Sequence, residues 1–501
     1  MASEIPSYLA AATPVPKENR APWYKNIAQT YAGVMLWFVF WQGLATVTGW
    51  RGGTLGAGLG VALLGILVGA LICHVFFYLV PGLLGMKTGL PLYVVGTSTY
   101  GALGGRIMPG LVMGLLQFGW LGVNAYAVAT LLCKCFAVPG VQEGVVVYPI
   151  VHPVHAAIAA VFAAAAAFMG LKGIQYVARV ATFLPLIPLV VLVVLLVTTI
   201  GGVANFSPDQ LAKPETPGRP LDMTHILIVL STVIVGFFAT AGAAGADIAM
   251  SSRNAKDVHF GGLVGIALAT MVAGGLSVTI VAGAYGAGLV PADLKGNLNP
   301  LDLMKGGLLN GLFGAEGGAT VANVFMILLA ISSFPGGCFS AFIAANSFKT
   351  TMPKINPWLS VGVGTLVSIA LAVTGLTGKV VEVFVVIGAS FGPVCGAMVA
   401  DYLISRGKWS GPRAGFNPAG WISLLVGFIV GAFQFMAPLI QKLIEMVPQI
   451  AQALPNIEFY KDVVPCPPVA AFIVGFLLYY LLARIGLKTR VLPMPQATSP
   501  A

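Results

Sequence analysis

Hydrophobic residues in this chain lie in long continuous runs. No charged residue occurs between Val180 and Pro208, or between Phe260 and Ala292. A run of about 20 apolar residues is long enough for one helix across a bilayer, whereas the strands of a membrane barrel alternate over segments of about 10 residues. The pattern therefore predicts an all-α polytopic membrane protein.

Twelve such runs give twelve predicted spans. They are expected near residues 31–49, 58–84, 107–133, 154–171, 180–202, 224–246, 260–286, 319–345, 357–376, 380–400, 418–438 and 467–483. Between the last two spans, apolar residues of 439–463 are spaced with Lys442 and Glu445 as in an amphipathic helix lying at the membrane surface.

Composition and charge support this interpretation. The chain is 58% hydrophobic and 8% charged, against about 25% charged for soluble domains. With both termini on one side, 17 of the 26 basic residues fall on that side and 11 of the 16 acidic residues on the other. The positive-inside rule then predicts a multi-pass protein of the cell (inner) membrane with both termini cytoplasmic. Because the basic residues are spread over eight segments, the net charge of +10 does not favour nucleic-acid binding. The bilayer is the expected macromolecular surrounding, and we expect a monomer.

The sequence gives little support for an enzyme. The six cysteines are scattered without zinc or redox spacing, and no G-x-x-x-x-G-K-[ST] phosphate loop is present. A membrane-embedded enzyme would need clustered His or Asp ligands or a nucleophile with a base, and the sequence shows neither. We therefore expect no catalytic residues, no metal site and no cofactor.

Glycine interruptions in two spans indicate a transporter. The first span contains Trp41-Gln42-Gly43, and the sixth contains the glycine-bounded segment from Gly236 to Gly242. Broken helices in corresponding positions of two halves are typical of transporter binding sites. Breaks in spans one and six fit a 5+5 inverted repeat with two additional helices. The alternative is that these glycines only allow close helix packing.

This interpretation divides the chain into five parts. They are a cytoplasmic tail (1–30), a first five-helix repeat (31–202), a second, inverted repeat (224–402), helices eleven and twelve (403–483) and a second cytoplasmic tail (484–501).

Span three carries Gln117, Trp120 and Asn124 on one helical face. Together these side chains can hydrogen-bond and stack against a flat polar ring. The alternative is a stripe of amphipathic residues that holds helices together.

Span eight contains Ser332 and Ser333, followed by Pro335 and two glycines that should interrupt the helix. The two hydroxyls could ligate a cation, or could bond back to their own helix.

Few titratable residues lie within the predicted spans. His74 lies inside span two, and Asp247 and Asp401 close spans six and ten. Titratable residues inside a membrane are candidates for coupling to a proton gradient. The alternatives are packing for His74, and ion pairs of the two aspartates with the nearby Arg253 and Arg406.

Five short motifs resemble one family. They are Trp50-Arg51-Gly52-Gly53-Thr54-Leu55-Gly56, Gly85-Met86-Lys87-Thr88-Gly89, Gln117-Phe118-Gly119-Trp120, Arg253-Asn254-Ala255-Lys256 with Ala246-Asp247 before it, and Ala400-Asp401-Tyr402-Leu403. In this order and spacing, the chain resembles the nucleobase–cation symporter-1 family, in particular its cytosine permease branch, from about residue 30 to 410.

The resemblance implies a leucine-transporter-type fold and alternating access. It implies a planar nitrogenous ring held between Trp120 and either Phe237 or Phe238, with Gln117 at the ring edge. The breaks in spans one and six add Gln42 and Gly236 to the expected substrate site, and the shared face of span three adds Asn124.

The expected coupling ion is H⁺ or Na⁺. In sodium-coupled relatives, hydroxyls in the middle of span eight face carbonyls of span one, which here would lie around Trp41 and Leu44. However, Pro335 and Gly336 stand where these relatives carry hydroxyls. Ser332 and Ser333 lie one turn earlier and could act as sodium ligands only if the helix is shifted, and asparagines that contact substrate in relatives are absent near Gly337. Proton coupling would use His74 or Asp247.

The sequence therefore predicts a secondary active symporter that imports a nucleobase or related planar nitrogen heterocycle, such as cytosine or a purine. The alternative is a carrier of the same fold for another small solute, such as a vitamin precursor, a ureide or an amine.

Overall fold

The structure is a computed structural model that describes residues 5–26, 54–138, 152–173, 183–184, 186–211, 223–290, 303–378, 380–435, 442 and 464–494. This part of the chain is almost entirely helical and contains two isolated β-bridges but no strand. Nine of its helices are long and apolar enough to cross a membrane, and two shorter apolar helices accompany them. The prediction of an all-α polytopic membrane protein is confirmed.

These eleven helices correspond to predicted spans two to twelve. In chain order they are α4 (Leu59–Ile72) continued by the π-helical η5 (Cys73–Tyr78) and α5 (Leu79–Thr88), η6 (Arg106–Leu111) with α8 (Val112–Cys135), α9 (Pro153–Lys172), α11 (Leu186–Thr199) with η7 (Ile200–Asn205), α12 (Met223–Ala243), α14 (Ala255–Gly262) with η9 (Leu263–Leu268) and α15 (Ala269–Gly286), α17 (Asn310–Ser332) with α18 (Phe334–Thr351), α19 (Pro357–Val373), α20 (Val380–Ile404), α21 (Pro418–Gly431) and α25 (Pro467–Arg484).

Several short elements lie before or between these spans. They are α1 (Ser7–Ala10), η1 (Lys17–Asn19), α2 (Trp23–Asn26), α6 (Leu92–Val95), α7 (Thr97–Tyr100), η8 (Pro208–Gln210), α13 (Gly245–Ala249), η10 (Met304–Leu308) and η11 (Leu376–Gly378). The predicted first span, 31–49, lies outside the described residues, as does the segment 439–463 apart from Lys442.

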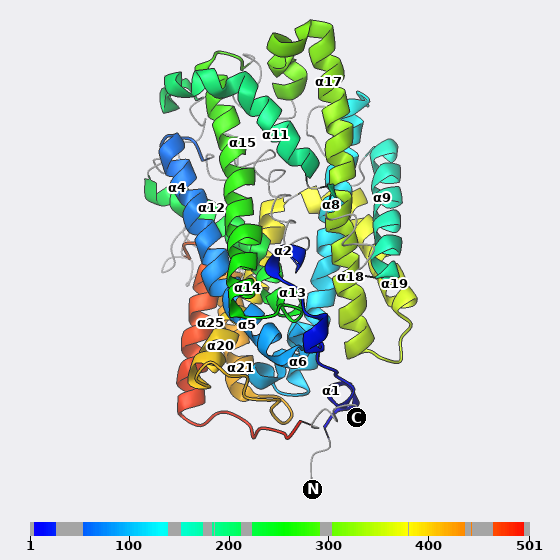
Figure 1. The fold of residues 1–501 in the computed structure, drawn as a ribbon, viewed down its shortest axis with the longest axis vertical. Helices are drawn as coiled ribbons and strands as arrows, with labels where there is room; N and C mark the ends of the chain where they lie inside the picture. The colour runs from blue at the N-terminus through cyan, green and yellow to red at the C-terminus, as the bar shows by residue number, and fades with distance from the viewer. Residues whose placement is uncertain are drawn as a thin grey trace.

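Two groups of helices face each other across the middle of the molecule (Figure 1). In one group, α8 packs against α9, α18 and α19. In the other, α12 packs against α4 and α20, and α20 packs against α21 and α25. The functional site described below lies where α8 and α18 approach α12, α13 and α20.

Spans two and seven are in contact at their π-helical turns, η5 and η9. In a 5+5 inverted repeat these are the second helices of the two halves, so their contact agrees with the expected pseudo-symmetry. The exact repeat boundaries, 31–202 and 224–402, stay a prediction.

The two described ends of the chain lie together at one end of the bundle. Tyr8 donates a hydrogen bond to the backbone oxygen of Ala102, and Leu9 and Leu492 belong to one hydrophobic cluster. Arg413 pairs with Val491 in an isolated antiparallel bridge. This arrangement is the one expected for the twelve predicted spans, because an even number of crossings returns the chain to the side on which it began.

The ion pairs expected from sequence proximity are wrong. Asp401 is paired with Arg413 (3.5 Å) and accepts a hydrogen bond from the Tyr479 hydroxyl (2.8 Å), while Arg253 pairs with Asp257 (3.2 Å). Arg406 has a positive φ of 52° at the turn after α20, and the chain reverses there and brings Arg413 back to Asp401. Proximity along the chain could not show this reversal.

Candidate functional site

A cavity of about 100 Å³ lies between the two groups of helices. Its polar lining consists of Gln117, Asn124, Thr240, Ser333 and Ser340, and no charged side chain is among the described residues that line it. Aromatic rings supply much of the remaining wall, namely Trp120, Phe237, Phe238, Phe339 and Phe384. The lining favours a small, flat, uncharged ligand with hydrogen-bonding edges.

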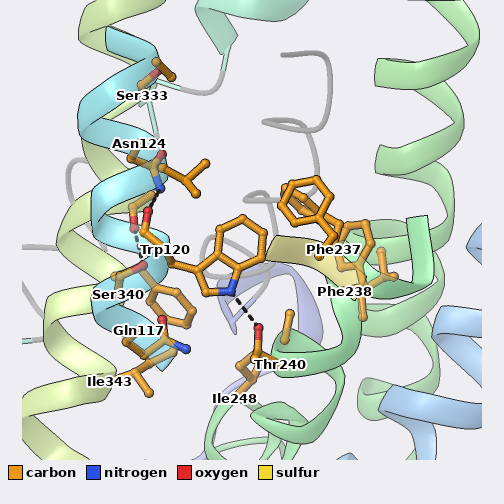
Figure 2. Close-up of a pocket in the computed structure, with 17 residues that line it drawn as sticks. Gln117, Trp120, Asn124, Phe237, Phe238, Thr240, Ile248, Ser333, Ser340 and Ile343 are labelled. Atoms are coloured by element: carbon orange, nitrogen blue, oxygen red, sulfur yellow. Dashed lines mark hydrogen bonds between the residues drawn. The ribbon is translucent and has the colours of Figure 1, made fainter. Parts of the chain in front are cut away.

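The stripe on span three points into this cavity. Gln117, Trp120 and Asn124, at i, i+3 and i+7 of α8, all line it (Figure 2). The indole Nε1–H of Trp120 donates to Thr240 Oγ1 on α12 at 3.1 Å. This bond fixes the indole plane, because the ring can turn only by losing its partner.

Trp120 lies in an aromatic cluster that differs from the expected sandwich. Its ring stacks on Phe384 of α20, with centroids 5.2 Å apart and planes inclined by 29°. Phe237 meets both rings edge-on, at 4.9 Å from Trp120 and 5.3 Å from Phe384. Phe238 lies edge-on to Phe237 at 5.0 Å. Trp120 and Phe237 are thus in direct edge-to-face contact, which is a preferred geometry of adjacent rings, and no space for a ligand ring is left between them.

Gln117 keeps most of its hydrogen-bonding capacity. Its side chain is buried, and its Nε2 donates only to the sulfur of Met113, at 3.5 Å, among the described residues. A thioether is a weak acceptor. The amide can therefore exchange this contact for a stronger one with a ligand edge.

The side-chain amide of Asn124 is already hydrogen-bonded within the protein. Its Nδ2 donates to the backbone oxygen of Trp120 at 2.9 Å. Its Oδ1 lies so close to α18 that a Cβ at Gly336 would come within 2.9 Å of it. Gly336 thus lets α8 and α18 approach each other beside the cavity.

Span eight is divided at Ser333, between α17 and α18, two residues before Pro335, and α18 runs without a break through Pro335 and the two glycines. Both serine hydroxyls bond back to the same carbonyl, since Ser332 (2.8 Å) and Ser333 (3.1 Å) donate to Leu329 O. Ser333 lines the cavity, whereas Ser332 is fully buried and is not part of its lining. Trp41, Gln42 and Leu44 lie outside the described residues.

The glycines of span six serve packing. α12 runs without a break from Met223 to Ala243, and the helix changes direction only at Ala244, before α13. A Cβ at Gly236 would lie 2.7 Å from the backbone oxygen of Phe384, and one at Gly242 would lie 2.6 Å from Phe77. Gly236 therefore supports α20 behind the cavity and is not in its lining, which corrects the expected helix break at this segment.

The two titratable candidates lie away from the central cavity. His74 packs against Tyr78, with ring centroids 6.2 Å apart, and its buried Nδ1 has no hydrogen-bond partner in the described part of the chain. Asp247 accepts a hydrogen bond from the backbone N–H of Leu92 at 3.3 Å and lines a second cavity.

Sequence reasoning missed Phe384, Thr240 and Ser340. Phe384 lies in an apolar span with nothing to mark it, and only the packing of α20 on α12 brings it to Trp120. Thr240 lies within the glycine-bounded segment of span six, and Ser340 lies two turns after Ser333 on α18. Among the described residues no three His, Cys, Asp or Glu side chains are grouped as a metal site would require.

Comparison with known proteins places this site in context. The family described as "Permease for cytosine/purines, uracil, thiamine, allantoin" matches residues 14–410. A comparison with curated protein sequences gave no match.

Several solved structures share the fold. One is Mhp1, a nucleobase-cation-symport-1 family transporter, in a closed conformation with bromovinylhydantoin bound (TM-score 0.62, 15% identity, 95% of each chain covered). Another is a Na⁺-coupled sialic acid symporter (TM-score 0.54, 13% identity, 95% of this chain and 92% of the other). A third is a manganese transporter from Eremococcus coleocola (TM-score 0.52, 13% identity, 96% and 99%). At these identities the likeness shows the fold, which is the leucine-transporter-type fold expected from the sequence.

Proposed function

The chain belongs to the permease family for cytosine, purines, uracil, thiamine and allantoin, and from this premise we propose that it is a symporter that imports a nucleobase or related planar nitrogen heterocycle. The observation that carries the proposal is the central cavity, which is lined by the ring of Trp120 and by the amide of Gln117. Among the described residues this amide makes only a weak hydrogen bond, to the sulfur of Met113. An amide both donates and accepts hydrogen bonds, which suits the neighbouring C=O and N–H groups of a nucleobase edge.

The ligand ring takes the place of Phe384 on the indole of Trp120. Phe384 is the ring stacked on Trp120 in the structure, and a flat heterocycle can replace that contact. Stacking contributes only about 0.5–1.5 kcal/mol beyond burial, and every flat ring can make it. Selectivity therefore comes from the hydrogen bonds of Gln117, with Ser340 and Thr240 as further hydroxyls in the lining.

The second candidate is a carrier of the same fold for a vitamin precursor, a ureide or an amine. The described residues that line the central cavity carry no charge, which argues against a cationic amine, because a buried charge needs a partner. A neutral ureide remains compatible with Gln117.

We expect coupling to a cation, with H⁺ preferred over Na⁺. In span eight, Pro335 and Gly336 carry no hydroxyl for a hard cation. Asp247, by contrast, is a titratable group that lines a cavity. The nearby end of the bundle gathers Arg20, Lys87 and Arg413, which bond to Met86, Gly407 and Ser98. By the positive-inside rule this end faces the cytoplasm of a cell membrane.

Uptake into proteoliposomes, with labelled cytosine, adenine, uracil, thiamine and allantoin under inward proton and sodium gradients, tests the proposal. Gradient-driven accumulation of a nucleobase is the expected result. Accumulation of allantoin alone would favour the ureide carrier, and no accumulation of any of the five would contradict both candidates.

A further inference from the structure

A second cavity of about 140 Å³ lies beside the central one, nearer to the end that carries both described chain ends. Its walls come from α6, η6 and the start of α8, α13, the loop after α13, and α18. Ser251 in this lining accepts a hydrogen bond through its backbone oxygen from the N–H of Ala21, at 2.8 Å. Through this contact the N-terminal segment lies directly against the wall of the cavity.

Three apolar side chains separate the two cavities. Ile248 of α13 and Phe339 and Ile343 of α18 line both of them. Figure 2 shows Ile248 and Ile343 beside Thr240 and Gln117, at one end of the central cavity. A ligand that leaves the central cavity past these three side chains enters the second cavity.

The polar residues of this second cavity, here termed the inner cavity, differ from those of the central cavity. It contains one carboxylate, Asp247, whose only hydrogen bond to another described residue is the 3.3 Å contact from Leu92 N. In the described part of the chain no cationic side chain forms an ion pair with Asp247, and Arg253, the nearest basic residue along the chain, is bound to Asp257. A carboxylate accepts up to four hydrogen bonds and donates none when ionised.

Flat side chains complete the inner cavity. Tyr93, Phe339 and Phe342 contribute aromatic rings, and Asn346 contributes an amide. The central cavity has the same combination of aromatic rings and a hydrogen-bond acceptor, because Trp120 and Gln117 both line it. The difference is that Asp247 selects for N–H donors, whereas Gln117 binds both donors and acceptors.

We propose that the inner cavity is a second binding station for the same heterocycle, in which Asp247 accepts hydrogen bonds from ring or exocyclic N–H groups before release. The proposal rests on the proposed function, because it assigns the second station to the same class of ligand. It predicts that transported rings carry at least one N–H donor. A ring with all its nitrogens methylated binds only the central station.

Equilibrium binding to purified protein in lipid nanodiscs tests the stations separately. The probe is whichever radiolabelled compound among cytosine, adenine, uracil, thiamine and allantoin binds the wild-type protein best. The expected stoichiometry is two per protein, falling to one in Asp247→Asn, which keeps the size of the side chain and an acceptor for Leu92 N–H. Asp209→Asn, at an exposed position within η8, is the matched control and keeps two.

A central-station variant gives the complementary result. Trp120→Ala should retain one weaker site, and the double variant Trp120→Ala/Asp247→Asn should retain none. A wild-type stoichiometry of one that Asp247→Asn leaves unchanged in number and affinity would overturn the inner station and leave the proposed function intact. If none of the five compounds binds, both fail.

A labelling experiment covers the case in which Asp247→Asn is poorly folded. Asn346→Cys, combined with Cys466→Ser because Cys466 is the one partly exposed cysteine of the six, places a thiol in the inner cavity. The same probe should slow its modification at least threefold, also in the Trp120→Ala background. Absence of protection in both backgrounds would overturn the proposal.

Discussion

The indole of Trp120 and the ring of Phe384 stack with their centroids 5.2 Å apart, although they lie 264 positions apart in the sequence and on helices of opposite groups. The contact closes the central cavity from the side of α20. If the transported ring takes the place of Phe384 on Trp120, the protein must break one aromatic contact to form another.

Phe384→Ala should therefore bind substrate more tightly. Removing the competing ring saves about 0.5–1.5 kcal/mol of stacking, which corresponds to an affinity gain of roughly 2- to 13-fold. Equilibrium binding in detergent or nanodiscs measures it. Phe391→Ala, seven residues further along α20 and equally buried, is the matched control. Weaker binding by Phe384→Ala alone would mean that Phe384 is a permanent wall of the bound state.

Gln117→Leu keeps the size of the side chain but leaves one ligand edge without a partner. Such a loss typically costs about 1–3 kcal/mol, so the affinity should fall roughly 5- to 150-fold. Competition binding with two ligands that differ in a single ring N–H gives the measurement. Met113→Leu, which removes only the present weak acceptor, should change the affinity little. Equal affinities for wild type and Gln117→Leu would remove Gln117 from the site.

The coupling ion can be read from proteoliposomes in which each gradient is imposed separately. An acid-outside gradient should drive uptake, and a sodium gradient at fixed pH should not. Asp247→Asn should reduce the proton-driven component more than His74→Gln, because Asp247 lines a cavity while His74 packs between helices. Strong stimulation by sodium without a response to the proton gradient contradicts this. Ser332→Ala and Ser333→Ala would then test the two hydroxyls as ligands.

The buried pair of Asp401 and Arg413 should be important for stability. Arg413 also donates to the backbone oxygens of Ser98 and Thr489, so it ties α7 and the C-terminal segment to α20. Arg413→Met leaves Asp401 buried without its cation, a loss typically of about 3–5 kcal/mol. Arg406→Met, which changes the arginine that proximity suggested, should cost far less. Thermal unfolding in one detergent compares the two, and equal melting temperatures would show that the pair contributes nothing.

Features that depend on local pattern could be predicted from the sequence. Continuous apolar runs located spans two to twelve, because a bilayer demands about 20 apolar residues whatever the tertiary packing. The stripe of Gln117, Trp120 and Asn124 faces the cavity because helical periodicity fixes which residues share a face.

Features that depend on contacts between distant helices could not be predicted. Phe384 reaches Trp120 only through the packing of α20 on α12, and Arg413 reaches Asp401 only through a reversal of the chain. Gly236 was expected in the substrate site, but its missing side chain makes room for the backbone of Phe384. In the sequence, a glycine that breaks a helix looks the same as a glycine that lets a neighbouring helix come close.

The most direct test of the central claim is nucleobase uptake by Trp120→Ala in proteoliposomes, beside the wild type and Trp358→Ala. Trp358 is half-exposed near the start of α19 and lines neither cavity. Protein recovery and melting temperature establish that each variant is folded. We expect gradient-driven uptake by the wild type and Trp358→Ala and none by Trp120→Ala. Uptake by Trp120→Ala at the wild-type rate would contradict the assignment of the cavity beside Trp120 as the transport site.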